Sequence, residues 1–508
     1  MRAITPTARG FGDYALPPAK TFTQMQCSAK VRKVFFTLLF ASLATLSFAL
    51  IPVSMPIALL GAAIFSYHTV KSLVATVALY YRAPPTPFPN PPHLPQLGAL
   101  APCSGFVTQN GVESHEWKLH LIRSAKNTLF ISGCYCGGRA FDETLDLIRE
   151  RMRLLPTLST AILSSNIFIS PENRRRIEQL TREFNGRFRC VISPEVFPYV
   201  SPTTDRLSLS TNHTKALVID HGAAFLVGGS GLVSAWSQQK GETLPKQLEQ
   251  HGFLYDSLMQ IRAYRDLDFV FQSPDRNGIG ALLHTEMSKL FNRFSPQPLP
   301  ISYPIPVPPL ALPRALPNLN AALYVSGPEQ PSSLFLNNLV AKVRQATRTI
   351  FIGHLYFHPP KKLLQALIDA SNRGVRITLI INRNGHRSPA SHSTFAELSR
   401  FYAKALYEGK VKPHIELYEY DVPHTTYHKK AIVIDQTTSF IGSSNLGYKS
   451  LSSVDYEVNC QIESPAFAAS LTQSLEADKR FCRANSTPHI TLKTRLLSFF
   501  QSFLTPFQ

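Results

Sequence analysis

The stretch that decides the fold is His-Thr-Lys-Ala-Leu-Val-Ile-Asp at residues 213–220, because it returns as His-Lys-Lys-Ala-Ile-Val-Ile-Asp at residues 428–435. Both copies read His-x-Lys-x4-Asp, and a run of small residues follows each, at 228–231 and at 442–445. The two histidines are 428 − 213 = 215 positions apart. One copy of such a phrase occurs by chance, but two matching copies indicate one active site assembled from two halves of the chain.

The residue types of the repeated phrase suit phosphodiester chemistry. The apolar, β-branched run after each histidine predicts a buried strand, on which the histidine and the lysine share one face. Cleaving a phosphodiester needs a nucleophile, a proton donor for the leaving oxygen and positive charge near the non-bridging oxygens. His213 and His428 suit the first two roles because imidazole titrates near neutrality. Lys215 and Lys430 supply the charge.

The small-residue runs are candidate phosphate-binding loops. Ser230, Ser443, Ser444 and Asn445 offer hydroxyl, amide and backbone N–H donors, and glycine permits close backbone approach to a ligand. The alternative is that each histidine is an ordinary strand residue before a turn. The agreement of the two copies in apolar filler, aspartate and small-residue run argues against it.

With these residues in view, the chain resembles the phospholipase D superfamily, whose signature is this duplicated phrase followed by Gly-Gly/Ser-x-Asn. The second copy has the full signature, which ends at Asn445. The first copy departs twice: it has one more residue between Asp220 and Gly228, and Gly231 stands where the family has asparagine. Its histidine and lysine are intact, so we still expect activity, with one phosphate contact fewer.

The resemblance implies a mechanism with a covalent phosphohistidine. One histidine attacks the phosphorus, and the other protonates the departing alcohol and then deprotonates the incoming water or alcohol. By resemblance His213 is the nucleophile and His428 the acid, although the symmetry of the motifs leaves this open. Lys215, Lys430 and Asn445 steady the phosphate oxygens. The chemistry needs neither metal nor cofactor.

The repeat extends beyond the motif, since residues 122–131 align with residues 343–352. An acidic strand follows each signature, and in the resembling family an acidic residue there hydrogen-bonds a catalytic histidine. Asp268 and Glu457 are the candidates, with an ion pair at a strand end as the alternative reading.

The two motif aspartates, Asp220 and Asp435, belong to the catalytic signature. We expect them to hold the backbone of the strand and turn rather than to touch substrate.

These observations predict an α/β protein with two duplicated α-β-α sandwich lobes related by a pseudo-two-fold axis and an N-terminal transmembrane helical hairpin. Two Pro-rich stretches separate the parts. The predicted divisions are a basic tail (1–33), the hairpin (34–82), a Pro-rich spacer (83–110), lobe 1 (111–295), a Pro-rich linker (296–318), lobe 2 (319–485) and an amphipathic C-terminal segment (486–508).

The hairpin prediction is based on residues 34–67, which contain no charged residue. Residues 34–53 and about 57–78 are each long enough to span a bilayer. Six basic residues precede the first span and Arg82 follows the second, so both ends and the lobes should be cytoplasmic. A cleaved signal peptide is the alternative, but the apolar part is too long for one. The amphipathic C-terminal segment could lie at a membrane interface or dock on lobe 2.

The composition predicts an anionic partner, because the net charge is +19 and the pI near 9.7. Acidic lipids and nucleic acids both fit. The seven cysteines are unpatterned, which favours a reducing compartment, and Cys134-Tyr135-Cys136 is not zinc-ligand spacing. The sequence predicts no oligomeric state.

The layout narrows the resemblance to bacterial cardiolipin synthases, which transfer a phosphatidyl group between two phosphatidylglycerols. It covers about residues 115–480, and the stretch 445–457 resembles that group after its second motif. We therefore expect a membrane-anchored phosphodiesterase or phosphatidyltransferase with a phospholipid substrate. Two alternatives are a nuclease of the same superfamily and a catalytically silent membrane scaffold.

Overall fold

The computed structural model describes residues 94–237, 263–383 and 414–485 with short gaps, and parts of 34–47, 61–73 and 399–406. The basic tail, residues 83–93 of the spacer, residues 300–309 of the linker and the C-terminal segment 486–508 lie outside the described residues.

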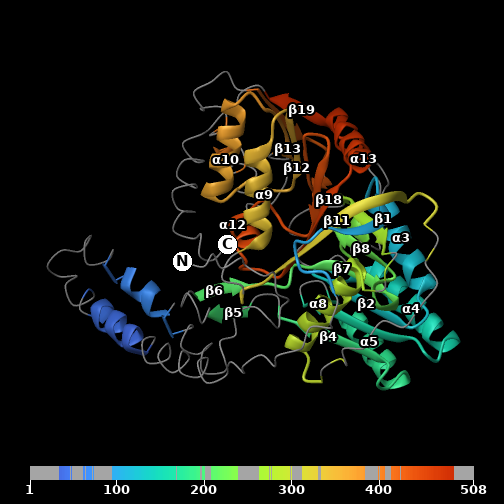
Figure 1. Cartoon of the computed structure of the whole chain (residues 1–508). Helices are drawn as coiled ribbons and strands as arrows, with labels where there is room; N and C mark the ends of the chain where they lie inside the picture. Colours follow the sequence, from blue (N-terminus) through green and yellow to red (C-terminus); the bar gives the residue numbers. More distant parts are fainter. Residues whose placement is uncertain are drawn as a thin grey trace, which may run out of the picture.

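Lobe 1 is a mostly antiparallel sheet that turns parallel at its outer edge, with helices on its outer face (Figure 1). Its helix α5 shows why the sequence folds locally: Ser170 and Asn173 form a capping box, and Pro171 takes the first helical position, where its missing N–H costs nothing. The main elements are β1 (Ala101–Val107), α3 (Gly111–Ser124), β2 (Thr128–Gly133), α4 (Gly138–Leu154), β3 (Ser159–Ser165), α5 (Pro171–Glu183), β4 (Phe188–Ser193), β7 (Lys215–Ile219), β8 (Ala224–Gly228), β10 (Asp268–Gln272) and α8 (Ile279–Phe294).

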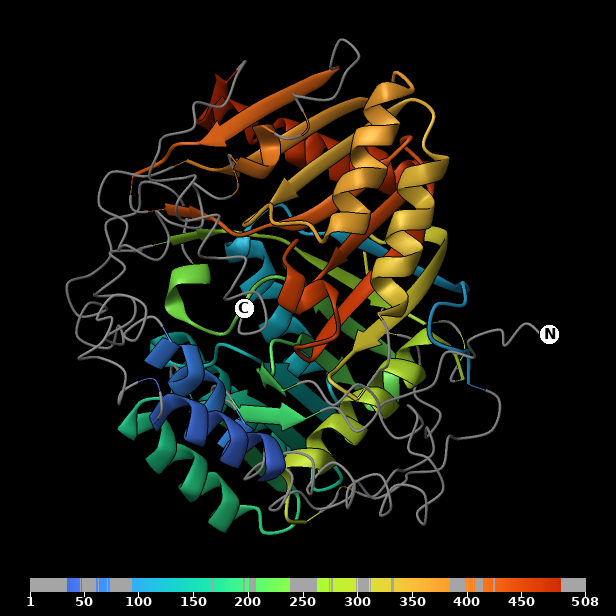
Figure 2. The ribbon, with the colours of Figure 1, turned by 90° about the vertical axis from the view of Figure 1, so that its left-hand side faces the viewer.

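Lobe 2 repeats this arrangement. Its helices α9 and α10 pack side by side over one face of its strands, as Figure 2 shows in yellow and orange. The main elements are β11 (Leu316–Ser326), α9 (Leu334–Gln345), β12 (Thr349–His354), α10 (Lys361–Asn372), β13 (Arg376–Asn382), β14 (Ile415–Tyr420), β16 (Lys430–Ile434), β17 (Thr438–Gly442), α12 (Tyr448–Leu451), β18 (Glu457–Glu463), α13 (Pro465–Glu476) and β19 (Cys482–Asn485).

The two lobes share one sheet of 15 strands rather than forming two separate sandwiches, in the order β19-β14-β13-β12-β16-β17-β18-β11-β1-β10-β8-β7-β2-β3-β4. From the central pair β11 and β1 the order reads alike outward in both directions. These two strands are antiparallel, with Ala101 opposite Ala321, so each covers an edge that would otherwise expose unpaired backbone groups.

Both central strands begin earlier than the predicted lobes. Strand β1 falls inside the stretch assigned to the spacer 83–110, and β11 begins within the predicted linker 296–318. Strands β1 and β11 pair with each other and join the two lobes, so each lobe begins earlier in the sequence than predicted.

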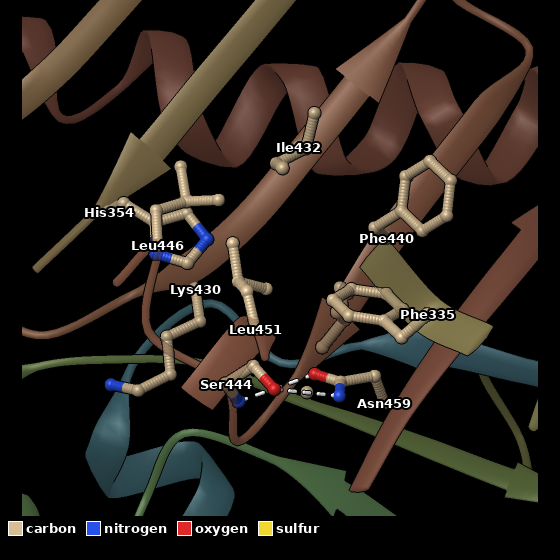
Figure 3. Close-up of a pocket in the computed structure, with 11 residues that line it drawn as sticks. Phe335, His354, Lys430, Ile432, Phe440, Ser444, Leu446, Leu451 and Asn459 are labelled. Carbon is tan, nitrogen blue, oxygen red and sulfur yellow. Dashed lines mark hydrogen bonds between the residues drawn. The ribbon is translucent and has the colours of Figure 1, made fainter. Parts of the chain in front are cut away.

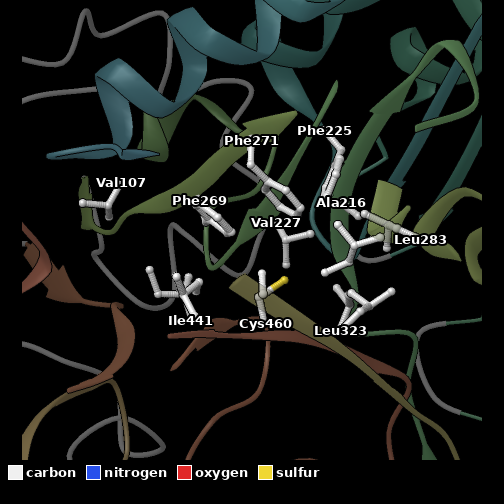
Figure 4. Packing of buried hydrophobic residues seen from close by; sticks show 14 of the residues in the cluster. Val107, Ala216, Phe225, Val227, Phe269, Phe271, Leu283, Leu323, Ile441 and Cys460 are labelled. Carbon is white, nitrogen blue, oxygen red and sulfur yellow. The ribbon is translucent and has the colours of Figure 1, made fainter. Parts of the chain in front are cut away.

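A hydrophobic core lies between the lobes, in addition to the cores beneath the outer helices. Figure 4 shows Phe225 and Phe271 of lobe 1 facing Leu323 and Cys460 of lobe 2, and all four are fully buried. Removing one such large side chain from water contributes about 1.5–3 kcal/mol, so this core ties the lobes together. The six cysteines of the described residues are free thiols.

The motif aspartates anchor the turn that follows each motif strand. Asp220 and Asp435 both adopt left-handed backbone conformations, with φ of 49° and 51°. The Asp220 carboxylate accepts backbone N–H groups of residues 126–128 at 2.6–3.2 Å. That of Asp435 accepts those of residues 347–349 at 2.8–2.9 Å. Each aspartate therefore binds the strand next to its own and does not contact the candidate nucleophiles.

Replacing Asp435 by asparagine is expected to lower the free energy of unfolding by about 2 kcal/mol, because hydrogen bonds to a charged acceptor are lost. Asparagine tolerates the left-handed conformation, so the turn is retained. Burial opposes ionisation of Asp435, but the backbone N–H groups outweigh it and lower its pKa. A lowered pKa stabilises the fold above the unfolded value of about 4 and stops doing so as the pH falls through the folded value. Urea unfolding of wild type and D435N should therefore differ at pH 7 and converge in acid; an equal difference at both would contradict the charge effect.

Two helical stretches in the region of the predicted hairpin lie against each other, apart from the lobes (Figure 1, blue). The Thr37 hydroxyl donates to Ser72 Oγ at 2.9 Å, and the rings of Phe40 and His68 stack at 5.0 Å. Over the residues that the structure describes, none of the helices combines the length and the apolar character that crossing a bilayer requires.

Candidate active site

The two motif histidines lie where the lobes meet. His213 precedes β7 and His428 precedes β16, and they are 8% and 4% exposed. The backbone N–H of each histidine donates to a carbonyl of the other lobe: His213 to Tyr456 at 3.0 Å and His428 to Arg265 at 2.8 Å. The two halves of the chain therefore hold each other's histidines in place.

Each imidazole is also oriented by a carboxylate of the opposite lobe. His213 Nδ1 lies 2.9 Å from Glu457 Oε1, and His428 Nδ1 lies 2.6 Å from Asp266 Oδ2. A carboxylate on Nδ1 selects the tautomer with its proton there. This tautomer leaves a lone pair on Nε2 of each ring, and Nε2 of His428 lies 3.1 Å from Lys430 Nζ.

Asp266, and not the predicted Asp268, is the partner of His428. Asp268 instead accepts hydrogen bonds from the backbone and hydroxyl of Ser230 and pairs with Lys118 Nζ at 3.1 Å. The strand register shows why Asp266 takes this role. Asp268 lies opposite Gly228 in lobe 1, and Asn459 lies opposite the equivalent Gly442 in lobe 2, so Asp268 corresponds to Asn459. The counterpart of Glu457 is therefore two residues before Asp268, roughly 6–7 Å along the chain.

The two half-sites differ in electrostatics. Burial raises the pKa of Asp266. Burial acts in the same sense on Glu457, but His213 and Lys215 outweigh it and the pKa of Glu457 is lowered. Burial lowers the pKa of His213 to about 4, against the opposing charge of Glu457. His213 is thus neutral at physiological pH, as a nucleophile must be.

The motif lysines lie beside their histidines. Lys215 Nζ donates to His213 O at 3.0 Å, and Lys430 Nζ donates to His428 O at 2.8 Å. Burial lowers the pKa of Lys430 to about 7, with Asp266 opposing and Lys215 reinforcing the shift. Lys215 belongs to lobe 1 and Lys430 to lobe 2, so its contribution to the pKa of Lys430 is an electrostatic interaction between the lobes.

The predicted phosphate-binding serines are used inside the protein. Ser443 donates to Glu457 and Ser230 to Asp268, while Ser444 Oγ accepts from Asn459 Nδ2 at 2.8 Å. These hydroxyls hydrogen-bond side chains of the adjacent strands β10 and β18 and thereby hold the loops in place. Asn445 differs, because its Oδ1 is buried and accepts no hydrogen bond from the described part of the chain.

A small pocket beside Lys430 shows the polar and apolar sides of the second half-site (Figure 3). His354, Lys430, Ser444 and Asn459 line it together with the apolar side chains of lobe 2. His354 is 4% exposed, and its Nδ1 has no hydrogen-bond partner among the described residues. Lobe 1 has Gly133 at the matching place opposite Lys215.

Three aromatic residues of lobe 1, which the sequence analysis did not single out as site residues, also contact the histidines. Tyr135 lies edge-on to His213 at 6.0 Å between ring centres, while Trp236 and Tyr264 each lie 5.2 Å from His428. Tyr135 stacks on Trp236, so one set of rings reaches from one imidazole to the other. The described residues include no group of three histidine, cysteine, aspartate or glutamate side chains that could hold a metal ion.

The duplicated α/β fold and the two His-x-Lys-x4-Asp motifs at the junction of the lobes make the chain similar to phospholipase D-like proteins. Residues 339–479 match the family model described as cardiolipin synthase, PLD-like domain. The predicted resemblance to the phospholipase D superfamily and to its cardiolipin synthase-like branch is thereby confirmed.

The chain is also similar to curated relatives and, in its fold, to a solved structure. The chain is 30% identical to cardiolipin synthase A of Pseudomonas entomophila (strain L48), over 34% of this chain and 34% of that protein. It is 28% identical to the minor cardiolipin synthase ClsB of Bacillus subtilis (strain 168), over 28% of this chain and 33% of that protein. The matches thus span about a third of these relatives. The crystal structure of phosphatidylserine synthase from Haemophilus influenzae Rd KW20 shares the fold, with a TM-score of 0.57, 13% identity and coverage of 80% of this chain and 95% of that one.

Proposed function

We propose that the protein is a phosphatidyltransferase or phosphodiesterase that acts on phospholipids through a covalent phosphohistidine. The observation that carries the proposal is the pair of imidazoles, each held at Nδ1 by a carboxylate of the opposite lobe and each beside a buried lysine. Such a pair supplies a nucleophile and an acid to one phosphorus atom.

In the first step His213 Nε2 forms a bond to phosphorus, and the bond from phosphorus to the departing alcohol oxygen breaks. His428, entering as the imidazolium, gives its proton to that oxygen. In the second step the neutral His428 takes a proton from an incoming alcohol or water, whose oxygen attacks phosphorus and displaces His213. Lys215 and Lys430 neutralise the phosphate oxygens, and Asn445 adds an amide N–H donor.

Several observations support a lipid as the substrate. The family model and the curated relatives carry the name cardiolipin synthase, which suggests transfer between two phosphatidylglycerols. The region of the proposed hairpin supports a membrane anchor, because its two helical stretches contact each other while Phe35, Leu38 and Val70 are at least 60% exposed. We propose that the hairpin spans a membrane and that the lobes lie on its cytoplasmic side.

Full-length protein purified in detergent can be assayed on labelled phosphatidylglycerol, phosphatidylcholine and single-stranded DNA. We expect turnover of phosphatidylglycerol, with cardiolipin and glycerol as the products of transfer. Cleavage of DNA alone would identify a nuclease, and no turnover of any substrate would favour the silent scaffold. Adding glycerol should drive the reaction backward if an alcohol is the acceptor, and product identity with and without it separates transfer from hydrolysis.

A further inference from the structure

Three stacked rings of lobe 1 connect the two histidines. Tyr135 and Trp236 lie 5.6 Å apart with 20° between their planes, and Trp236 and Tyr264 lie 4.0 Å apart at 13°. The stack meets His213 at one end and His428 at the other, in each case edge to face. Trp236 lies in the middle and is 2% exposed.

Lobe 2 lacks this stack. By their spacing from the motif and strand positions described above, the counterparts of Tyr135, Trp236 and Tyr264 are Tyr356, Ser450 and Asp455. Tyr356 stacks on His358, while Asp455 accepts hydrogen bonds from Thr211 and pairs with Lys449.

The stack also explains the missing asparagine of the first motif. A Cβ atom at Gly231 would lie 2.7 Å from Tyr135 O, 3.0 Å from Tyr135 Cβ and 3.3 Å from a ring carbon of Trp236. The first of these atoms is backbone and cannot move away easily. The space of the asparagine side chain is therefore taken by the backbone and Cβ of Tyr135 and by the edge of the Trp236 ring, and glycine fits there.

Trp236 also makes a polar contact with the site. Its indole Nε1–H donates to Asp266 Oδ2 at 2.8 Å, and this oxygen is the one that faces His428 Nδ1 at 2.6 Å. The other oxygen, Oδ1, accepts the backbone N–H of Leu267 at 2.9 Å. The indole N–H and the imidazole thus share a single acceptor atom, which lies in a fully buried carboxylate.

From this geometry we infer that Trp236 is a positioning residue for the proposed phosphohistidine chemistry, which holds Asp266 and the His428 ring in register and moderates the basicity of the carboxylate. The inference rests on the proposed function. It adds a role for a residue outside the duplicated motif and makes the two half-sites chemically different.

The direction of the effect follows from the shared oxygen. Without the indole N–H, Asp266 Oδ2 is a stronger hydrogen-bond acceptor for His428 Nδ1–H, and this stabilises the imidazolium. The titration midpoint of the His428 ring should then move upward by about one pH unit. The other groups that act on this half-site remain unchanged in the variant; they are Lys430 on β16, Lys215 on β7, Glu457 on β18, His354 on β12 and Tyr264 beside the ring.

The test is Trp236→Phe, which retains an aromatic ring in the stack and removes the N–H donor together with part of the indole. We expect kcat to fall about tenfold with little change in KM. In a plot of kcat against pH, the alkaline limb, where His428 loses its proton, should move to higher pH. The matched control is Trp117→Phe, because the chain has only two tryptophans. Trp117 lies on helix α3, where its ring contacts Phe106 and His120 rather than His213 or His428. W117F should leave both kcat and the alkaline limb of its pH profile unchanged.

A second readout does not depend on activity. The protein with 15N-labelled histidine is titrated by NMR, and the His428 signal is the one absent in H428Q. An upward shift in W236F alone supports the inference even if no lipid is turned over, in which case only the proposed function fails. The inference would be overturned if W236F were active and neither the alkaline limb of its pH profile nor the NMR titration midpoint of His428 moved.

Should W236F fail to fold, the single-tryptophan protein W117F still decides the question. Trp236 is then the only indole, and its emission should fall as the neighbouring His428 becomes protonated, because an imidazolium in contact quenches indole fluorescence. This pH dependence should disappear in W117F/H428Q. If the pH dependence of the emission were the same in W117F and W117F/H428Q, the two rings would not be in contact and the inference would be overturned.

Discussion

Replacing His213 by alanine is expected to lower the rate of phosphodiester transfer by at least about 10⁴-fold, because the nucleophile itself is lost. Replacing His428 by alanine should cost about 10²–10⁴-fold, the usual contribution of a general acid or base. The two variants should also differ in kind. With a labelled lipid that has a good leaving group, H428A should accumulate label on the protein as acid-labile phosphohistidine, whereas H213A should accumulate none.

The control for both variants is His414→Ala, since this exposed histidine lies just before β14. It should keep wild-type activity. Label on H213A but not on H428A would reverse the assigned roles, and full activity in either variant would contradict the two-histidine mechanism. The pH profile adds a check: because His213 must be neutral to attack and burial lowers its pKa to about 4, the acid-side loss of activity should appear only as the pH falls through that value. The alkaline-side loss belongs to His428, which must enter the reaction protonated.

Replacing Asp478 by alanine is expected to lower the free energy of unfolding by about 3–5 kcal/mol, which is the cost of leaving buried partner charges uncompensated. Asp478 Oδ1 accepts from Arg265 Nε at 2.8 Å, and Lys429 Nζ lies 2.6 Å from Oδ2. The side chains of Asp478 and Lys429 are fully buried. The triad also matters for the site, because the carbonyl of Arg265 holds the backbone of His428.

Urea unfolding of D478A measures this cost, and Glu476→Ala is the matched control. Glu476 pairs with Lys479 at 2.8 Å on the surface, where its side chain is 49% exposed, so its removal should cost less than about 1 kcal/mol. The double variant D478N/K429M should lose less than D478A, because it removes the unpaired charge together with its partner. Equal losses in D478A and E476A would show that the triad does not join the lobes.

Much of the fold could be predicted because the chain is a repeat. The apolar runs of 215–219 and 430–434 predicted strands that the structure contains as β7 and β16, since a β-branched run is buried wherever a sheet is covered on both faces. The aspartates that end these runs were expected to hold the turn. Asp220 and Asp435 do so because a short carboxylate in the left-handed conformation can reach the N–H groups of the adjacent strand.

The contacts of the site were harder to predict, because they depend on strand register and on the packing of one lobe against the other. Asp266 and Asp268 are two residues apart, and in an extended segment such residues lie on the same side, so the alternation pattern cannot distinguish them. Ser230 and Ser443 look like phosphate ligands in the sequence, but in the fold their hydroxyls meet carboxylates of the strand behind them.

The two half-sites, with the histidines and lysines that belong to them, could be identified from the amino-acid sequence, because a repeated motif is a property of the chain alone. The folded chain was needed to reveal that each histidine pairs with a carboxylate of the opposite lobe. It was also needed to reveal that Trp236 and Tyr264 contact the ring of His428, whereas Tyr135 contacts that of His213. The physical reason is that these contacts join residues up to 244 positions apart, and only the docking of the two lobes determines which of them come within hydrogen-bonding distance.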